Sequence, residues 1–111
     1  MDKDLVADLA NIKFEMDTGS HKKYIATIPK NIWTKWRKDK FRKTVKFGDN
    51  RYQQYKDRIG DWSFLDHRDK KRRDRYRARH SKIMKVLTEE YTLPSYEVPF
   101  TPEWFSWYLL W

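Results

Sequence analysis

The chain has 111 residues and a formal net charge of +9, from 25 Lys and Arg against 16 Asp and Glu. This length indicates one domain, and the absence of cysteine excludes disulfides and thiolate metal sites. No apolar run approaches the roughly 20 residues of a membrane span, and the acidic first residues do not resemble a signal peptide, so we expect no membrane span.

The charges are distributed unevenly along the chain. Residues 21–88 carry a net charge of +16, whereas residues 1–20 carry −3 and residues 89–111 carry −4. A basic segment of this kind attracts polyanions, either nucleic acid or an acidic protein surface. Aromatic residues make up 17% of the chain, which argues against a disordered protein, because disordered segments contain few aromatics.

Residues 1–20 are predicted to form an acidic amphipathic helix or arm before the basic domain. The apolar residues of 2–16 recur at the spacing of one helix face: Leu5, Leu9, Ile12 and Met16. Residues 18–20, Thr-Gly-Ser, end the pattern. This face packs either on the chain's own domain or on another protein. For the second alternative the candidate interface residues are Leu5, Leu9 and Ile12.

Residues 22–47 are predicted to form a small antiparallel sheet. Residues 22–29 alternate as a strand does, and residues 31–49 are expected to add one or two hairpins. In the second stretch aromatic and basic residues interleave. Rings exposed on a basic strand pair can stack on bases, but the commoner arrangement buries the rings and leaves the cations in solvent. The candidate polyanion contacts of this stretch are Lys35, Arg37, Lys38 and Arg42.

A short helix is expected over residues 51–59, and a long basic helix from about residue 66 to about residue 87. Five basic residues of the long helix fall within an arc of about 80°: Arg68, Arg72, Arg75, Arg79 and Lys82. These residues form either a solvated face or a polyanion contact. We expect a contact without sequence specificity, because their charges share one sign and arginine binds phosphate and carboxylate groups with two hydrogen bonds.

The same segment is bounded by His67 and His80, and an Asp-His pair before a helical histidine is similar to one-metal nucleases of the His-Asn-His kind. On a continuous helix, thirteen residues span about 19.5 Å, whereas two ligands of one metal lie within about 5 Å of each other. The chain also contains no phosphate-binding loop, nucleophile elbow or HExxH motif. We therefore expect no catalytic residue, no metal site and no cofactor.

The last residues are predicted to close the domain with an aromatic helix. Three prolines within nine residues indicate an extended connection, and Thr101-Pro102-Glu103 is a typical helix start. The segment that follows is apolar on nearly all sides, so it closes the core. Trp107 and Trp111 are kept as candidate contacts with a neighbouring molecule.

Four blocks occur in order along the chain: KKYIATI, KTVKFGDNRYQQYKDRIG, LDHRDKKRRDRYRARH and FTPEWFSWYLLW. Together they resemble a family of small basic proteins of unknown function from nucleocytoplasmic large DNA viruses and related phage contigs. Residues 1–20 and 29–42 depart from the family pattern. The resemblance implies a viral origin. It assigns no role to any residue, because the family has no established activity.

Together these features predict an α+β fold, in which residues 21–111 form a single basic domain. A small antiparallel sheet over about 22–47 packs with a long basic helix over about 66–87, with an N-terminal amphipathic helix and an aromatic C-terminal helix.

We expect a non-enzymatic viral structural or virion-associated protein of the minor capsid or cement type. It would be found in the virion and in the cytoplasm or nucleus of the infected host cell. Its basic surface would contact an acidic capsid-protein surface or the genome. The alternative is an accessory or packaging protein that binds DNA or RNA without sequence specificity, and a one-metal nuclease is a distant third.

Overall fold

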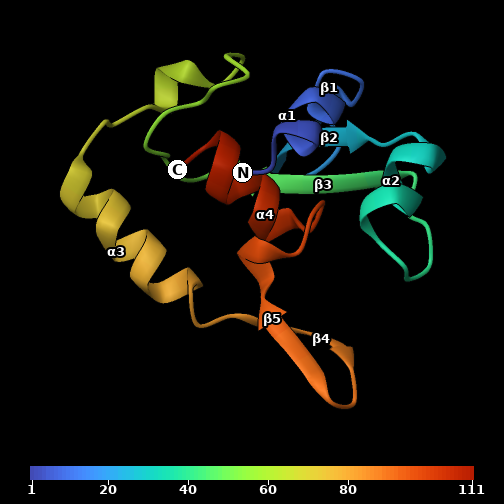
Figure 1. Cartoon of the computed structure of the whole chain (residues 1–111). Coiled ribbons are helices and arrows are strands. Elements are labelled where there is room, and N and C mark those ends of the chain that lie inside the picture. Colours follow the sequence, from blue (N-terminus) through green and yellow to red (C-terminus); the bar gives the residue numbers. More distant parts are fainter.

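The computed structural model describes all 111 residues as an α+β fold (Figure 1). The larger sheet is antiparallel, with the strand order β1-β2-β3. Its strands are β1 (Lys13–Met16), β2 (Lys22–Thr27) and β3 (Thr44–Asp49). A second antiparallel sheet pairs β4 (Met84–Thr88) with β5 (Tyr91–Pro94). The predicted fold class is confirmed.

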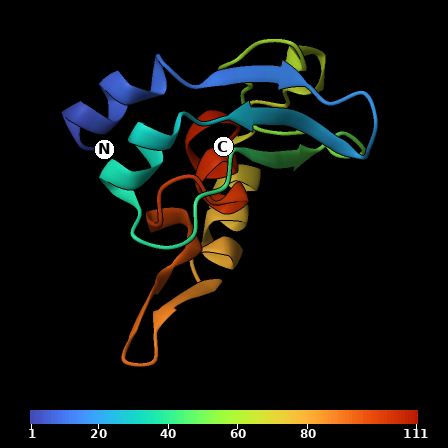
Figure 2. The same cartoon turned by 90° about the vertical axis from the view of Figure 1, so that its right-hand side faces the viewer.

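The chain also forms four α-helices: α1 (Lys3–Leu9), α2 (Lys30–Trp36), α3 (Lys70–His80) and α4 (Pro102–Leu109). Two short 3-10 turns, Ser63–Leu65 and Ser95–Glu97, lie in the connections. Figures 1 and 2 show α4 between the larger sheet and α3, and the β4–β5 hairpin projecting away from the body. The basic helix α3 is therefore separated from the sheet by the aromatic helix.

The core lies between the larger sheet and α4. Phe47 of β3 stacks on Phe105 of α4 with ring centroids 4.9 Å apart, and on Tyr24 of β2 at 5.6 Å. The helix start at Thr101 is as predicted, because its hydroxyl accepts a hydrogen bond from the backbone N–H of Trp104 at 3.0 Å. The C-terminal helix thus closes the core, as the sequence indicates.

The N-terminal helix is shorter than predicted. It ends at Leu9, and residues 13–16 form β1, which pairs with β2. The ring of Phe14, on β1, packs edge-on against Phe47 and Phe105. The apolar spacing of residues 2–16 satisfies a helix, but a strand in this place pairs its backbone and buries an aromatic ring. Residues 18–20 form the turn between β1 and β2 instead of ending a helix.

Leu5 and Ile12 are buried in the core, and Leu9 packs against it. These three residues therefore contact the chain's own domain, and their assignment to an interface with another protein is wrong. Residues 1–20 belong to the same sheet and core as the remainder of the chain.

The predicted hairpins over residues 31–49 are also partly wrong. Residues 30–36 form α2, and only β3 follows as a strand. The helix is held to α1 by Asp8, which accepts a hydrogen bond from Trp36 Nε1 at 2.7 Å and lies 3.0 Å from Lys35 Nζ. Trp33 is buried, so its ring is not available to stack on bases.

Two further helix predictions need correction. Residues 51–59 form an irregular loop and not a helix. The basic helix occupies only Lys70–His80, because Arg68 adopts a φ of 55° and the Asp69 carboxylate caps the backbone N–H groups of the next turn. Residues 84–88, expected at the end of this helix, form β4.

Candidate polyanion interface

Helix α3 concentrates positive charge that nothing in the chain neutralises. Seven of its eleven residues are Lys or Arg, with a single Asp among them. The five ion pairs of the protein involve other basic residues: Lys13, Lys35, Arg37, Lys46 and Arg51. None of the α3 cations therefore forms an ion pair with an Asp or Glu side chain, although Arg72 donates to Gln53 and Arg77 to the Trp111 carbonyl.

The inner side of α3 is attached to the body through rings. Tyr76, the buried residue of the helix, is stacked between His80 at 4.0 Å and Trp111 at 4.1 Å. The guanidinium of Arg73 lies 4.6 Å from the ring centroid of Tyr55. Such cation–π contacts stabilise by about 0.5–2 kcal/mol. They hold the helix in place without neutralising its charge.

Another side of α3 carries three of the five residues of the predicted arginine stripe: Arg72, Arg75 and Arg79, which we call the α3 basic face. Arg75 and Arg79 are exposed, and Arg72 donates a hydrogen bond to Gln53 Oε1 at 2.8 Å. Arg68 and Lys82 are exposed but lie outside the helix, one before and one after it. The predicted alignment of all five residues on one helix is wrong, because the helix is shorter than expected.

Arg37 is not a surface contact, contrary to prediction. It is buried, and its guanidinium makes two hydrogen bonds to the Asp39 carboxylate, at 2.8 and 2.5 Å. It also donates to the Pro99 carbonyl at 2.8 Å and lies 4.5 Å from the Trp33 ring centroid. This arginine joins two segments that are 62 residues apart.

The other three candidates from residues 31–42 remain on the surface. Lys35 is paired with Asp8, whereas Lys38 and Arg42 are exposed and form no ion pair. Of the four residues predicted in this stretch, only Lys38 and Arg42 keep an uncompensated charge at the surface.

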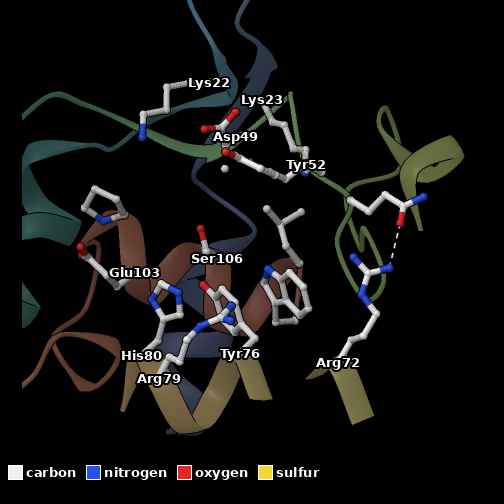
Figure 3. Close-up of a pocket in the computed structure, with 15 residues that line it drawn as sticks. Lys22, Lys23, Asp49, Tyr52, Arg72, Tyr76, Arg79, His80, Glu103 and Ser106 are labelled. Carbon is white, nitrogen blue, oxygen red and sulfur yellow. Dashed lines mark hydrogen bonds between the residues drawn. The ribbon is translucent and has the colours of Figure 1, made fainter. Parts of the chain in front are cut away.

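A cleft of about 480 Å³ lies beside the basic face, between α3, α4 and the ends of β2 and β3 (Figure 3). Four cationic side chains line it: Lys22, Lys23, Arg72 and Arg79. Its other polar and aromatic lining includes Asp49, Tyr52, Gln53, Tyr76, His80, Glu103, Ser106 and Trp111. The sequence did not indicate this cleft, since Lys22 and Arg79 meet only through the folding of the chain.

The carboxylate of Asp49 does not cancel the charge of the cleft, because it is already paired. Arg51 Nε and Nη2 donate to its two oxygens at 3.0 and 2.8 Å. This pairing holds the pKa of Asp49 well below its usual range. Glu103 is the second acid of the lining. Cationic side chains therefore outnumber free carboxylates in the cleft.

Lys23 has a structural role at the same place. Its ammonium is buried and donates to the Tyr52 carbonyl at 2.9 Å and to Gln54 Oε1 at 2.5 Å. Gln54 Nε2 in turn donates to the Trp62 carbonyl at 2.8 Å and to Asp66 Oδ1 at 2.6 Å. Burial lowers the pKa of Lys23 to about 8. This network attaches the loop that leads into α3 to the sheet, so it positions the basic face.

The two histidines stand at opposite ends of one aromatic row. His80 stacks on Tyr76, Tyr76 on Trp111, and His67 lies 5.3 Å from Trp111. No group of three or more His, Asp or Glu side chains is placed to hold a metal ion. Burial is the main cause that lowers the pKa of both imidazoles, with the positive charges of Arg72 and Arg79 contributing to it.

Trp107 and Trp111, the candidates for contact with a neighbour, both pack within the chain. Trp107 stacks on Tyr96 at 3.9 Å, and Trp111 stacks on Tyr76. Both rings are half-buried, so their main contacts are part of the domain's closure. Part of the exposed apolar surface lies on the β4–β5 hairpin, at Met84, Val86 and Tyr91, and other parts lie at Val6, Tyr52 and Phe64. The sequence missed the hairpin because most residues of β4 were expected to form the end of the basic helix.

None of the helices is both long enough and apolar enough to span a membrane. Comparison of the chain with protein-family models, with curated proteins and with solved structures finds no match. The resemblance to small basic viral proteins therefore stays a prediction.

Proposed function

We propose that this chain is a non-enzymatic protein that binds nucleic acid without sequence specificity through the α3 basic face. The observation that supports it is the uncompensated charge of α3, which carries seven cations and no ion pair. Like charges one helical turn apart destabilise a helix by about 0.2–0.5 kcal/mol per pair. A polyanion bound along this face relieves that repulsion.

The spacing of the face suits a phosphate backbone. Arg72 and Arg79 are seven residues apart, which corresponds to about 10.5 Å along the helix axis. One strand of a nucleic acid advances by about 3.4 Å per phosphate, so the face covers about three phosphates. All three residues are arginines, whose planar fork matches two phosphate oxygens.

The test is fluorescence anisotropy with labelled DNA and RNA across a salt series. Neutralising three phosphates makes the slope of log K against log salt about −2.7 for a duplex. The triple variant R72A/R75A/R79A should lose most of that slope and bind at least about tenfold more weakly at 0.1 M salt. The control K3A/K40A/K43A removes three exposed, unpaired cations from other segments of the chain. Equal loss in both variants, or no binding by the wild type, contradicts the proposal.

A structural or virion-associated role, of the minor capsid or cement type, is the second candidate. The β4–β5 hairpin favours it, because Met84 and Val86 are 51% and 68% exposed on a two-stranded sheet that projects from the body (Figure 2). Isolated hairpins are marginally stable in water, and contiguous exposed apolar surface is typical of protein contacts. Mass spectrometry of purified virus particles tests this role. Abundant copies support it, and absence from the particles contradicts it.

A further inference from the structure

We infer that the cleft between α3, α4 and the ends of β2 and β3 holds one nucleotide of a single strand, so that the protein prefers single-stranded nucleic acid to duplex. The inference rests on the proposed binding of nucleic acid by α3, and it names the form of nucleic acid that the same region takes.

The cationic side chains approach the cleft from two opposite walls. Lys22 comes from β2, and Arg72 and Arg79 come from α3 (Figure 3). None of the three forms an ion pair. The hydrogen bond from Arg72 to Gln53 joins two residues of the cleft lining and orients one guanidinium. A phosphate between these walls gains charge-assisted hydrogen bonds from both sides.

The remaining lining suits the rest of a nucleotide. Tyr52 is 65% exposed and lines the cavity together with Trp111, whereas the ring of Tyr76 is already stacked between His80 and Trp111. Aromatic side chains beside a basic groove are the usual means of binding single strands, because every base can stack on them. A site for phosphate alone would not need these rings.

Polar groups of the cleft complement the donors and acceptors of a base and a sugar. The Glu103 carboxylate accepts hydrogen bonds, and the Ser106 hydroxyl both accepts and donates. A carboxylate weakens a site for an isolated anion, but it can bind a base amine or a sugar hydroxyl. This combination favours a nucleotide over inorganic phosphate.

The size of the cleft excludes a duplex. A volume of about 480 Å³ falls within the range of about 300–1,000 Å³ that is usual for small-ligand sites. As a rounded cavity it is roughly 10 Å across, which admits one nucleotide but not a base pair together with both of its backbones. Only an unpaired nucleotide can enter, while a duplex is limited to the part of the α3 basic face that lies outside the cleft, at Arg75.

A free nucleotide has the same chemistry as one residue of a strand, so the experiment compares both. The binding of a labelled single-stranded 12-mer, of its duplex, of AMP and of inorganic phosphate is measured with the same protein. We expect the single strand to bind about tenfold or more tightly than the duplex, with AMP competing more strongly than phosphate. A single strand bound no more tightly than AMP assigns the cleft to free nucleotides and overturns the inference. Equal competition by phosphate and AMP also overturns it.

Two matched variants separate the cleft from the basic face. Lys22→Ala removes an exposed cation of the cleft that lies outside α3, whereas Arg75→Ala removes an α3 cation outside the cleft. In Lys22→Ala the ratio of the affinity for the single strand to the affinity for the duplex should fall toward 1. In Arg75→Ala the affinities for the single strand and for the duplex should fall by the same factor. An unchanged preference in Lys22→Ala overturns the inference and leaves the α3 proposal intact. Failure of the wild type to bind either form would overturn both.

Discussion

The buried ammonium of Lys23 makes the stability of the protein depend on alkaline pH. Burial lowers the pKa of this group in the folded protein to about 8, from its ordinary value of 10.5. At a pH between these two pKa values, the Lys23 side chain keeps its proton in the unfolded chain but has released it in the folded protein. The free energy of unfolding therefore rises with pH in this window, and the stabilisation is complete only above 10.5.

The size of the effect follows from the two pKa values. The full shift corresponds to about 3 kcal/mol at about 1.36 kcal/mol per pKa unit. Between pH 7 and pH 9.5 the free energy of unfolding should rise by about 2 kcal/mol, which is part of the full effect. The range stops at 9.5 because burial raises the pKa of Tyr24 and Tyr76. These tyrosines keep their protons in the folded protein, so above pH 10 they lower its stability.

The measurement is urea unfolding at pH 7.0, 8.0, 9.0 and 9.5, for the wild type and for Lys23→Met, which keeps the length of the side chain without its charge. The wild type should gain about 2 kcal/mol relative to the variant over this range. If the variant does not fold, an NMR titration of the Lys23 side chain gives its pKa directly. Parallel pH profiles, or a Lys23 that titrates near 10.5, would refute the reasoning.

Two pairs of substitutions test the packing that positions the cleft and the core. Gly48→Ala should cost about 2–4 kcal/mol in urea unfolding, because Gly48 has a φ of 74° and a new Cβ would lie 3.0 Å from Leu110 Cδ1. Gly19→Ala, whose Cβ would have no atom closer than 3.7 Å, should change stability by less than about 0.5 kcal/mol. Arg37→Ala should cost about 3 kcal/mol and Lys38→Ala less than about 0.5 kcal/mol, since only the first is buried and hydrogen-bonded. Equal costs within either pair would contradict the structural assignment.

The elements that the sequence predicted well are those whose signals are local and mutually consistent. Alternation over 22–29 identifies β2, and the Thr101-Pro102 start identifies α4. Short segments were predicted less well. Residues 13–16 carry apolar side chains that satisfy a helix, and residues 30–36 were expected as a strand. Over four to seven residues the periodicity of a helix is hard to distinguish from that of a strand, and packing against the rest of the chain decides between them.

The candidate site also has features that the sequence predicted and features that it did not. The charge of α3 can be counted from the sequence, and three of the five predicted stripe residues do lie on one side of the helix. The burial of Arg37 could not be predicted, because its acceptor at Pro99 is 62 residues away. The cleft was also missed, because no local pattern brings Lys22 of β2 opposite Arg79 of α3.

The sequence by itself determined the composition of the protein: a basic middle between acidic ends, an aromatic closing segment and an α+β content. These properties depend on residue type and on neighbours within a few positions. Only the tertiary structure decided which cations remain free and which rings are buried. Those outcomes depend on contacts between segments far apart in the chain, and local sequence patterns do not predict such contacts. Long-range packing is thus what turned a run of like charges into a helix face beside a cleft.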